Sequence, residues 1–153
     1  SFLCSLGAQN AGVRLLWHKI ELLDAVGTRK CGRPTYSHAL CYSREGCYGL
    51  EDNSCDVGQR GFMAWSRAMG IGTCTRAIEF LLRNGCETVT DPFCGTGTVL
   101  AVANFFGLSA TGIDISPKRC RQSERATVDS ILTQYYPSPA RTSGGGEAED
   151  GQE

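Results

Sequence analysis

Apolar residues along this chain predict strands in its first third and a helix near its middle. Two apolar-rich, β-prone runs of strand length occupy residues 12–20 and 36–43, and the glycine- and charge-bearing segment between them suits a hairpin connection or a flexible loop. A polar loop spans residues 44–61. Apolar residues then recur at helical spacing over 69–82, and Asn84–Gly85 is suited to end that helix.

The pattern that follows predicts a strand, a helix and a second strand. Residues 88–90 form a short β-prone run, residues 99–106 form a helix that stops at Gly107, and residues 110–113 form the second strand. Ser116–Pro117 is suited to cap the one helix that remains. Two strands joined by one helix are expected to lie parallel, because a parallel pair requires such a crossover. The sequence therefore predicts an α/β fold around one βαβ unit.

Each of these two strands ends at an acidic residue, and this placement indicates the chemistry of a ligand. Asp91 precedes a turn of Gly95, Thr96 and Gly97, and Asp114 follows that turn by about twenty residues, the usual separation of a ribose-binding carboxylate. No lysine or arginine lies between the first acid and the second strand, so the turn suits an ammonium group better than a pyrophosphate. A ligand with an amino-acid ammonium, a ribose and an adenine matches both acids, and S-adenosylmethionine is such a ligand.

The same residues resemble motifs of a known family. DPFCGTGT (91–98) and GIDI (112–115) resemble the cofactor- and ribose-binding motifs of S-adenosylmethionine-dependent amino-methyltransferases that modify exocyclic nitrogens of nucleic acid bases. A dinucleotide-binding domain is disfavoured, because residue 100 is leucine where that motif has its third glycine. The resemblance implies a Rossmann-like methyltransferase sheet, S-adenosyl-L-methionine as cofactor, and RNA or DNA as substrate. The cofactor-binding residues expected on this basis are Asp91, Phe93, Gly95, Thr96, Gly97, Thr98, Asp114, Ile115, Arg67 and Met69.

Local structure offers a second interpretation of several of these residues. The alternatives are turn capping by Asp91, a surface acid at Asp114, core packing of Phe93 and Ile115, helix capping by Thr96 and Thr98, and a solvated loop arginine at Arg67. Trp65 covers the pocket in one interpretation and anchors the core in the other.

The upstream half resembles the branch of this family in which the motif order is permuted. There a Trp-x-Lys strand, a second strand and a helix precede the glycine motif, and the matching segments are 17–19, 37–43, 56–57 and 65–82. The resemblance covers most of residues 12–131. It implies that the glycine motif stands last in the chain.

One part of the family pattern is absent. The catalytic turn, an Asp, Asn or Ser followed by Pro-Pro and an aromatic residue, occurs nowhere in the 153 residues, and only sixteen residues precede Trp17, where the permuted order would place it. We therefore assign no catalytic residue and expect that the front catalytic part is missing, since the chain also begins at Ser1 rather than methionine. Two alternatives stay open: an RNA guanine-N2 methyltransferase fragment, and a non-catalytic, methyltransferase-like partner subunit.

The composition says little about the substrate, but it bears on metal binding, compartment and membrane insertion. The nine cysteines form no Cys-x-x-Cys pair and the two histidines lie within strand patterns, so we expect no metal site and an intracellular, reducing compartment. The formal net charge is −1, and basic residues near 19–33 and 118–125 either meet phosphates or form ordinary solvated faces. No apolar run is long enough to span a membrane.

The last segment differs from the rest. Residues 137–153 contain no large apolar side chain and many glycines and acids, so we expect a disordered acidic tail behind a methyltransferase-like domain of residues 1–136.

Overall fold

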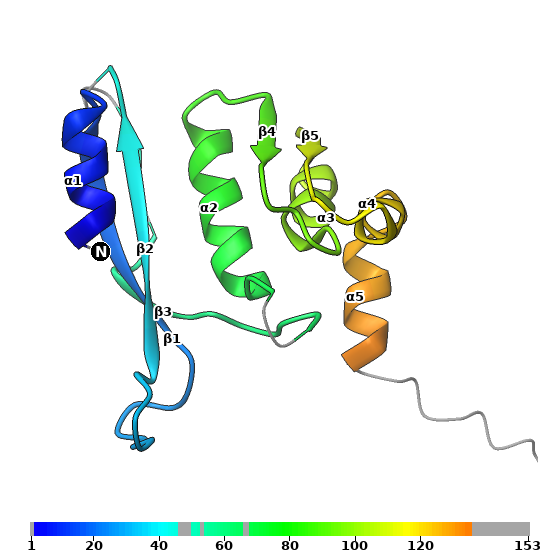
Figure 1. The fold of residues 1–153 in the computed structure, drawn as a ribbon, viewed down its shortest axis with the longest axis horizontal. Coiled ribbons are helices and arrows are strands. Elements are labelled where there is room, and N and C mark those ends of the chain that lie inside the picture. The colour runs from blue at the N-terminus through cyan, green and yellow to red at the C-terminus, as the bar shows by residue number, and fades with distance from the viewer. Residues whose placement is uncertain (1, 46–49, 53, 66–67, 136–153) are drawn as a thin grey trace, which may run out of the picture.

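The computed structural model describes residues 2–45, 50–52, 54–65 and 68–135. They form two small sheets with helices packed between and beside them (Figure 1). In chain order the elements are α1 (Phe2–Asn10), β1 (Arg14–Leu22), β2 (Tyr36–Ser43), β3 (Val57–Gln59), α2 (Ile71–Arg83), β4 (Thr88–Asp91), α3 (Thr98–Phe105), β5 (Ser109–Gly112), α4 (Pro117–Ser123) and α5 (Val128–Tyr135).

The first sheet has the strand order β2-β1-β3. β1 and β2 form the expected antiparallel hairpin, in which Lys19 pairs with Ala39 and Glu21 with Ser37. β3 lies parallel to β1 on the opposite side. Because side chains alternate along a strand, Trp17, Lys19 and Glu21 share one face of β1, and that face lies against α2.

Helix α2 joins the hairpin to the rest of the molecule. Its buried residues, Cys74, Ile78 and Phe80, lie on the part of the helix surface that meets its neighbours. The ring of Phe80 meets Trp17 edge to face, with 5.5 Å between ring centroids. Asn84 ends the helix, and its side-chain amide donates to the carbonyl of Phe80 at 2.8 Å.

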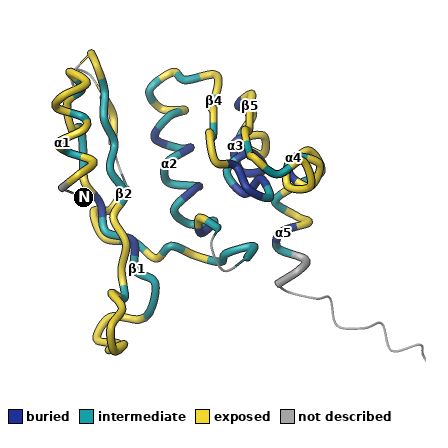
Figure 2. The backbone as a smooth tube through the Cα atoms, in the orientation of Figure 1, coloured by how far each residue is buried: buried dark blue, intermediate teal, exposed yellow. Residues whose placement is uncertain are grey.

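The second sheet is the predicted βαβ unit. β4 and β5 lie parallel, with Thr88 opposite Ser109 and Asp91 opposite Gly112, and α3 is their crossover helix. Buried residues concentrate in α3 and on α2, whereas α1 and α4 are largely exposed (Figure 2). The core cluster consists of Cys74, Ile78, Val102, Ala103 and Leu108. It therefore joins α2, α3 and the residue that leads into β5.

Several sequence-based predictions need correction. Two helices, α4 and α5, follow Asp114 where one was expected, and the polar loop contains the short strand β3. Residues 2–10, for which the sequence analysis predicted no element, form α1. Ser116 begins α4 without a side-chain capping bond; its backbone N–H donates instead to Asp114 Oδ1 at 2.7 Å. The expected tail, residues 137–153, lies outside the described residues.

Within the described part of the chain, no helix is both long and apolar enough to cross a bilayer.

Candidate cofactor site

Two glycines give the turn after β4 its shape. Gly95 and Gly97 have φ values of +55° and +89°, which side-chain-bearing residues rarely adopt. Both also allow close packing: a Cβ on Gly97 would lie 2.8 Å from Ser123 Cα, and one on Gly95 would lie 3.3 Å from Trp65 Cζ2. The turn therefore needs glycine for its conformation and for the approach of α4 and Trp65.

Asp91 lies at the carboxyl end of β4, directly before this turn. Its Oδ1 accepts a hydrogen bond from the Phe93 backbone N–H at 2.9 Å, so the turn-capping interpretation is confirmed. The carboxylate also lines a cavity of about 290 Å³ beside the turn. Capping uses one hydrogen bond of a group that can accept about four, so the same carboxylate can meet a ligand.

Half of the expected cofactor-binding residues line that cavity. Its complete lining is Trp65, Ala68, Met69, Asp91, Phe93, Cys94, Gly95, Thr98 and Val99. Five of these were expected from sequence, and Trp65 was expected as its cover. Ala68, Cys94 and Val99 were not expected as lining residues, although Cys94 stands inside the glycine motif itself.

The cavity wall contains one unsatisfied polar atom. The hydroxyl of Thr98 is buried, the residue being 4% exposed, and it has no hydrogen-bond partner among the described residues. Thr98 is the first residue of α3, whose N-cap is Gly97, so the threonine does not cap the helix. Buried hydroxyls are normally bonded. The Thr98 oxygen has less than 1 Å² of accessible surface, so a ligand would reach it only after the side chain rotates toward the cavity.

Cys94 contributes a neutral surface to the same wall. Its side chain is 6% exposed, and burial raises the pKa of the thiol despite a contact with the Ser123 hydroxyl that lowers it. The thiol stays protonated at neutral pH, where it behaves as a small apolar group.

Asp114 lies just after β5, near the end of the second strand as the sequence analysis expected, and its side chain is 7% exposed. Oδ2 accepts the Gly95 backbone N–H at 3.2 Å and Oδ1 that of Ser116 at 2.7 Å, while Arg119 lies 3.7 Å away. The carboxylate thus ties the end of β5 to the glycine turn, and it does not line the cavity of Asp91.

Phe93 and Ile115 are exposed, which excludes the core-packing interpretation. Phe93 is 87% exposed and lines the cavity, and Ile115 is 100% exposed after Asp114. Large apolar side chains held in solvent beside a cavity are suited to cover a ligand.

Trp65 forms a wall between two cavities. It separates the Asp91 cavity from one of about 350 Å³, whose lining includes the expected residue Thr96. The guanidinium of Arg119 lies over the Trp65 ring, 5.3 Å from its centroid, which is within cation–π range. Arg67, expected near the ligand carboxylate, lies outside the described residues.

Two buried ion pairs on β1 were missed by the sequence analysis. Lys19, expected in a basic cluster, is 3% exposed and bonds Asp52 at 2.8 Å. Glu21 is equally buried and accepts hydrogen bonds from Arg76 and Thr73 of α2. The signal in the sequence was their spacing, because residues 19 and 21 must share a strand face. These pairs attach the segment after β2 and the start of α2 to the hairpin.

The two histidines contact each other on the exposed surface of the hairpin. His18 Nε2 and His38 Nδ1 lie 2.7 Å apart. Among the described residues, no group of three or more His, Cys, Asp or Glu side chains could hold a metal ion.

Comparison with known proteins shows which solved structures share this fold. No protein-family model matches the chain, and no curated protein matches it. Solved structures do: three crystal structures of a putative DNA modification methylase from Thermus thermophilus superpose with TM-scores of 0.61, 0.58 and 0.57 at 15–16% sequence identity. One of the three is a complex with S-adenosyl-L-methionine.

These matches cover 82–87% of this chain but only 59–60% of the methylase chain. The chain therefore spans about 60% of the length of that protein. At this identity the likeness is one of fold: the chain shares the α/β fold of these structures.

Proposed function

We propose that this chain carries the cofactor-binding half of an S-adenosylmethionine-dependent methyltransferase that acts on an exocyclic base nitrogen of RNA or DNA. The observation that carries the proposal is the cavity beside the glycine turn, where Asp91, Thr98 and Met69 meet. The methylase of similar fold has been crystallised with the same cofactor, which supports the proposal.

The residues of the cavity fit the chemistry of this ligand. Asp91 supplies an anionic acceptor for an ammonium group, and the buried hydroxyl of Thr98 supplies an unsatisfied donor and acceptor. Phe93 and Trp65 supply aromatic surface. S-adenosylmethionine would supply an activated methyl group there.

The chain's own residues would contribute binding and exclusion of water. We propose that Asp91 orients the amino-acid end of the ligand, while Gly95 and Gly97 keep the backbone close to it. Asp114 acts here through the turn, because its carboxylate holds the amide of Gly95 at 3.2 Å. A contact of Asp114, Gly97 or Ile115 with the ligand itself stays a prediction, as does one of Arg67 or Thr96.

We further propose that the acceptor base is positioned by residues outside this chain. No Pro-Pro pair occurs among its five prolines, so the turn that orients the amino group in the related family is absent from these residues. A permuted motif order accounts for the glycine motif standing near the end of the sequence.

The same absence favours one competing function. A non-catalytic subunit that keeps the fold, and stabilises an active relative, would also lack the Pro-Pro-aromatic turn. Neither binding nor turnover by this chain alone separates the two functions. In an active complex, Asp91→Asn in this chain should abolish methyl transfer if this chain holds the cofactor, and should leave it unchanged if this chain only stabilises an active relative.

Calorimetric titration of the chain with S-adenosylmethionine tests the cofactor proposal. We expect binding, and Asp91→Asn should weaken it by about ten-fold or more, the cost of one charge-assisted hydrogen bond. Asn keeps an acceptor for the Phe93 N–H, so the turn should survive. Asp24→Asn, which removes the same charge from the hairpin loop, is the matched control.

A methyl-transfer assay of this chain alone on bulk RNA and DNA tests where the acceptor site lies, and we expect no turnover. Turnover by this chain alone would contradict the proposal that the acceptor site lies elsewhere. Failure of the unmodified chain to bind S-adenosylmethionine would overturn the cofactor site itself.

A further inference from the structure

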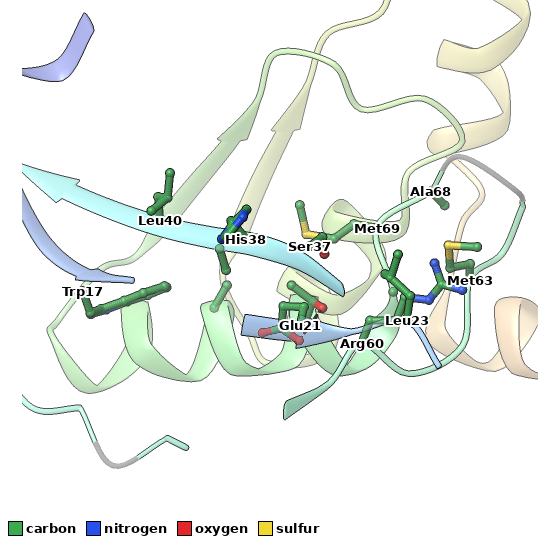
Figure 3. Close-up of a pocket in the computed structure, with 14 residues that line it drawn as sticks. Trp17, Glu21, Leu23, Ser37, His38, Leu40, Arg60, Met63, Ala68 and Met69 are labelled. Carbon is green, nitrogen blue, oxygen red and sulfur yellow. Dashed lines mark hydrogen bonds between the residues drawn. The ribbon is translucent and has the colours of Figure 1, made fainter. Parts of the chain in front are cut away.

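A second, larger cavity lies between the hairpin and α2, away from the glycine turn. It measures about 500 Å³, and Figure 3 shows its lining side chains from β1, β2, and the segment that leads into α2. Most of that lining is apolar, including Leu23, Met63, Met69 and Ala77. Ala68 and Met69 also line the Asp91 cavity, so the two spaces are neighbours.

Four consecutive residues of β2, Ser37 to Leu40, line this cavity. Side chains of a strand alternate between its faces, so four in a row cannot all belong to one face. Figure 3 shows His38 and Leu40 on the opposite side of the β2 ribbon from Trp17 and Glu21. The cavity therefore runs along the outer edge of β2, where backbone groups are exposed to it.

The backbone of that edge is unpaired within the described residues. The N–H of Leu23 donates to the carbonyl of Thr35 at 2.8 Å, and the register then gives Ser37 and Ala39 the hydrogen bonds to β1. In an antiparallel pair the alternate residues, His38 and Leu40, direct their N–H and C=O groups outward. β2 is the last strand of its sheet on this side.

In the described part of the chain, β4 forms a similar unpaired edge of the second sheet. Its pairing to β5 uses the carbonyls of Glu87 and Asp91, which accept from Ser109 and Ile113. The backbone N–H and C=O groups of Thr88 and Thr90 therefore point away from β5, and both residues are exposed. A two-stranded parallel sheet is uncommon, because parallel sheets are normally continued and covered.

The β2 edge lacks the usual protection. Natural edge strands carry lysine, proline or a bulge that prevents further pairing. Residues 36–43 contain no lysine or proline, and the irregularity in the hairpin lies between Leu15 and Trp17 of β1.

We propose that the outer edge of β2 accepts an extended segment of a partner polypeptide, which adds a strand to this sheet and fills the cavity. The segment is apolar at alternate positions, because one of its faces would meet Met63, Met69 and Ala77. The methylase of similar fold contains chain that has no counterpart in these residues, and a polypeptide of that kind is the occupant that satisfies both the backbone edge and the apolar wall. This inference does not rest on cofactor binding.

The test uses the purified chain and a short synthetic peptide of alternating threonine and valine with lysine at both ends. Hydrogen exchange followed by NMR should show the amides of His38 and Leu40 exchanging fast and those of Ser37 and Ala39 protected. Adding the peptide should slow the first pair by about ten-fold or more. The same peptide with alternate backbone nitrogens methylated should have no effect.

Two variants locate the binding. His38→Pro removes the outward N–H, whereas His38→Ala removes the same imidazole and keeps the N–H. Proline is tolerated at such an edge position, so both should fold. Peptide binding should persist in His38→Ala and be lost in His38→Pro.

Three results would overturn the proposal. One is equal peptide binding by both variants. Another is no slowing of the His38 and Leu40 amides at a peptide concentration of about 1 mM, the weak end of specific binding. The third is protection of those amides that rises with protein concentration alone, or on adding adenosine monophosphate, because the occupant would then be a second copy or a nucleotide.

Discussion

At the scale of single residues, the cavity beside the glycine turn is notable for what its side chains leave unbonded. Asp91 uses one oxygen to hold Phe93, and Thr98 uses none of its hydroxyl within the described residues. Such groups lower the stability of the empty protein and raise its affinity for a ligand that pairs with them.

Thr98→Val tests this balance. Valine has nearly the same shape but no hydroxyl, so the free energy of unfolding should stay the same or rise by up to about 1 kcal/mol. Urea unfolding monitored by circular dichroism measures it. A loss of more than about 1 kcal/mol would show that the hydroxyl has a partner in the folded chain.

The same variant should weaken S-adenosylmethionine binding in the titration described above. Thr96→Val, on the other side of Trp65, is the matched control. Equal effects of the two variants would place the ligand differently from our proposal.

Gly112 illustrates how closely β5 packs behind the site. A Cβ at this position would lie 2.5 Å from Leu100 Cδ1 and 2.8 Å from Cys94 Sγ. Gly112→Ala should therefore lower the free energy of unfolding by about 1–3 kcal/mol through overpacking. Gly7→Ala in α1, where nothing lies within 4 Å, should instead raise it by about 0.5–1 kcal/mol. Denaturant midpoints of the two variants on opposite sides of the wild type would support this account, and a neutral Gly112→Ala would contradict it.

At the scale of elements, β1 organises the first half of the chain through two buried charges. Lys19 bonds Asp52 and the carbonyls of Ser54 and Cys55, and Glu21 bonds α2. Removing one partner of such a pair leaves the other charge buried and unpaired, which is more costly than the pair itself is stabilising.

The Lys19–Asp52 pair makes stability depend on pH. Burial alone would raise the pKa of Asp52, but hydrogen bonds from Lys19 and Ser54 outweigh it and hold that pKa below its usual value of 3.8. The folded state therefore releases this proton more readily than the unfolded state does. The contribution to stability is present above pH 3.8 and is lost as the pH falls through the lower native value.

Asp52→Asn should remove that dependence. Its free energy of unfolding should be lower than that of the wild type at pH 7, and the two values should converge as the pH falls below 3.8. Urea unfolding over this range measures it. Glu51→Gln, at the neighbouring exposed acid, should follow the wild-type profile. If the difference in free energy of unfolding between Asp52→Asn and the wild type stayed constant down to the lowest pH, the Lys19–Asp52 pair would not be the cause of the pH dependence.

At the scale of the whole molecule, a hairpin body and a βαβ body share α2 as their common support. The core cluster joins α2 to α3 and to the residues before β5. The hairpin contacts the same helix through Trp17 and Glu21. Ala68 and Met69, just before α2, line both cavities, so a shift of that segment would change the two cavities together.

We propose that residues 1–136 are sufficient for this architecture. Residues 137–153 contain no large apolar side chain that could be buried. A chain ending at Tyr136 should keep the free energy of unfolding within about 0.5 kcal/mol, the range of changes that touch no packed feature. Thermal unfolding of the two chains measures this, and a larger loss would show that the last residues pack on the domain.

Sequence predicted the elements whose signals are local. The βαβ unit follows from Gly95, Gly97 and Gly107, and its strands moved by at most one residue. β3 was missed because three residues in a polar loop carry no periodic signal, and only their distant partner, β1, makes them a strand.

The site was predictable to the same extent, because only its locally encoded residues could be found from the sequence. Asp91, Phe93 and Thr98 belong to one continuous motif, and they do line one cavity. Ala68 reaches that cavity from a separate segment, and the hydrogen bond from the Gly95 N–H to Asp114 joins two parts of the motif, because tertiary packing decides which way each side chain faces. The contact of Asp114 with a ribose stays a prediction.

The chain has two tryptophans, and the fold puts one in each body. Trp17 contacts Phe80 edge to face, and Trp65 lies against the glycine turn. Trp17→Phe therefore leaves a single tryptophan, at the wall of the Asp91 cavity. Its emission would report occupancy of that cavity directly, without any label attached to the protein.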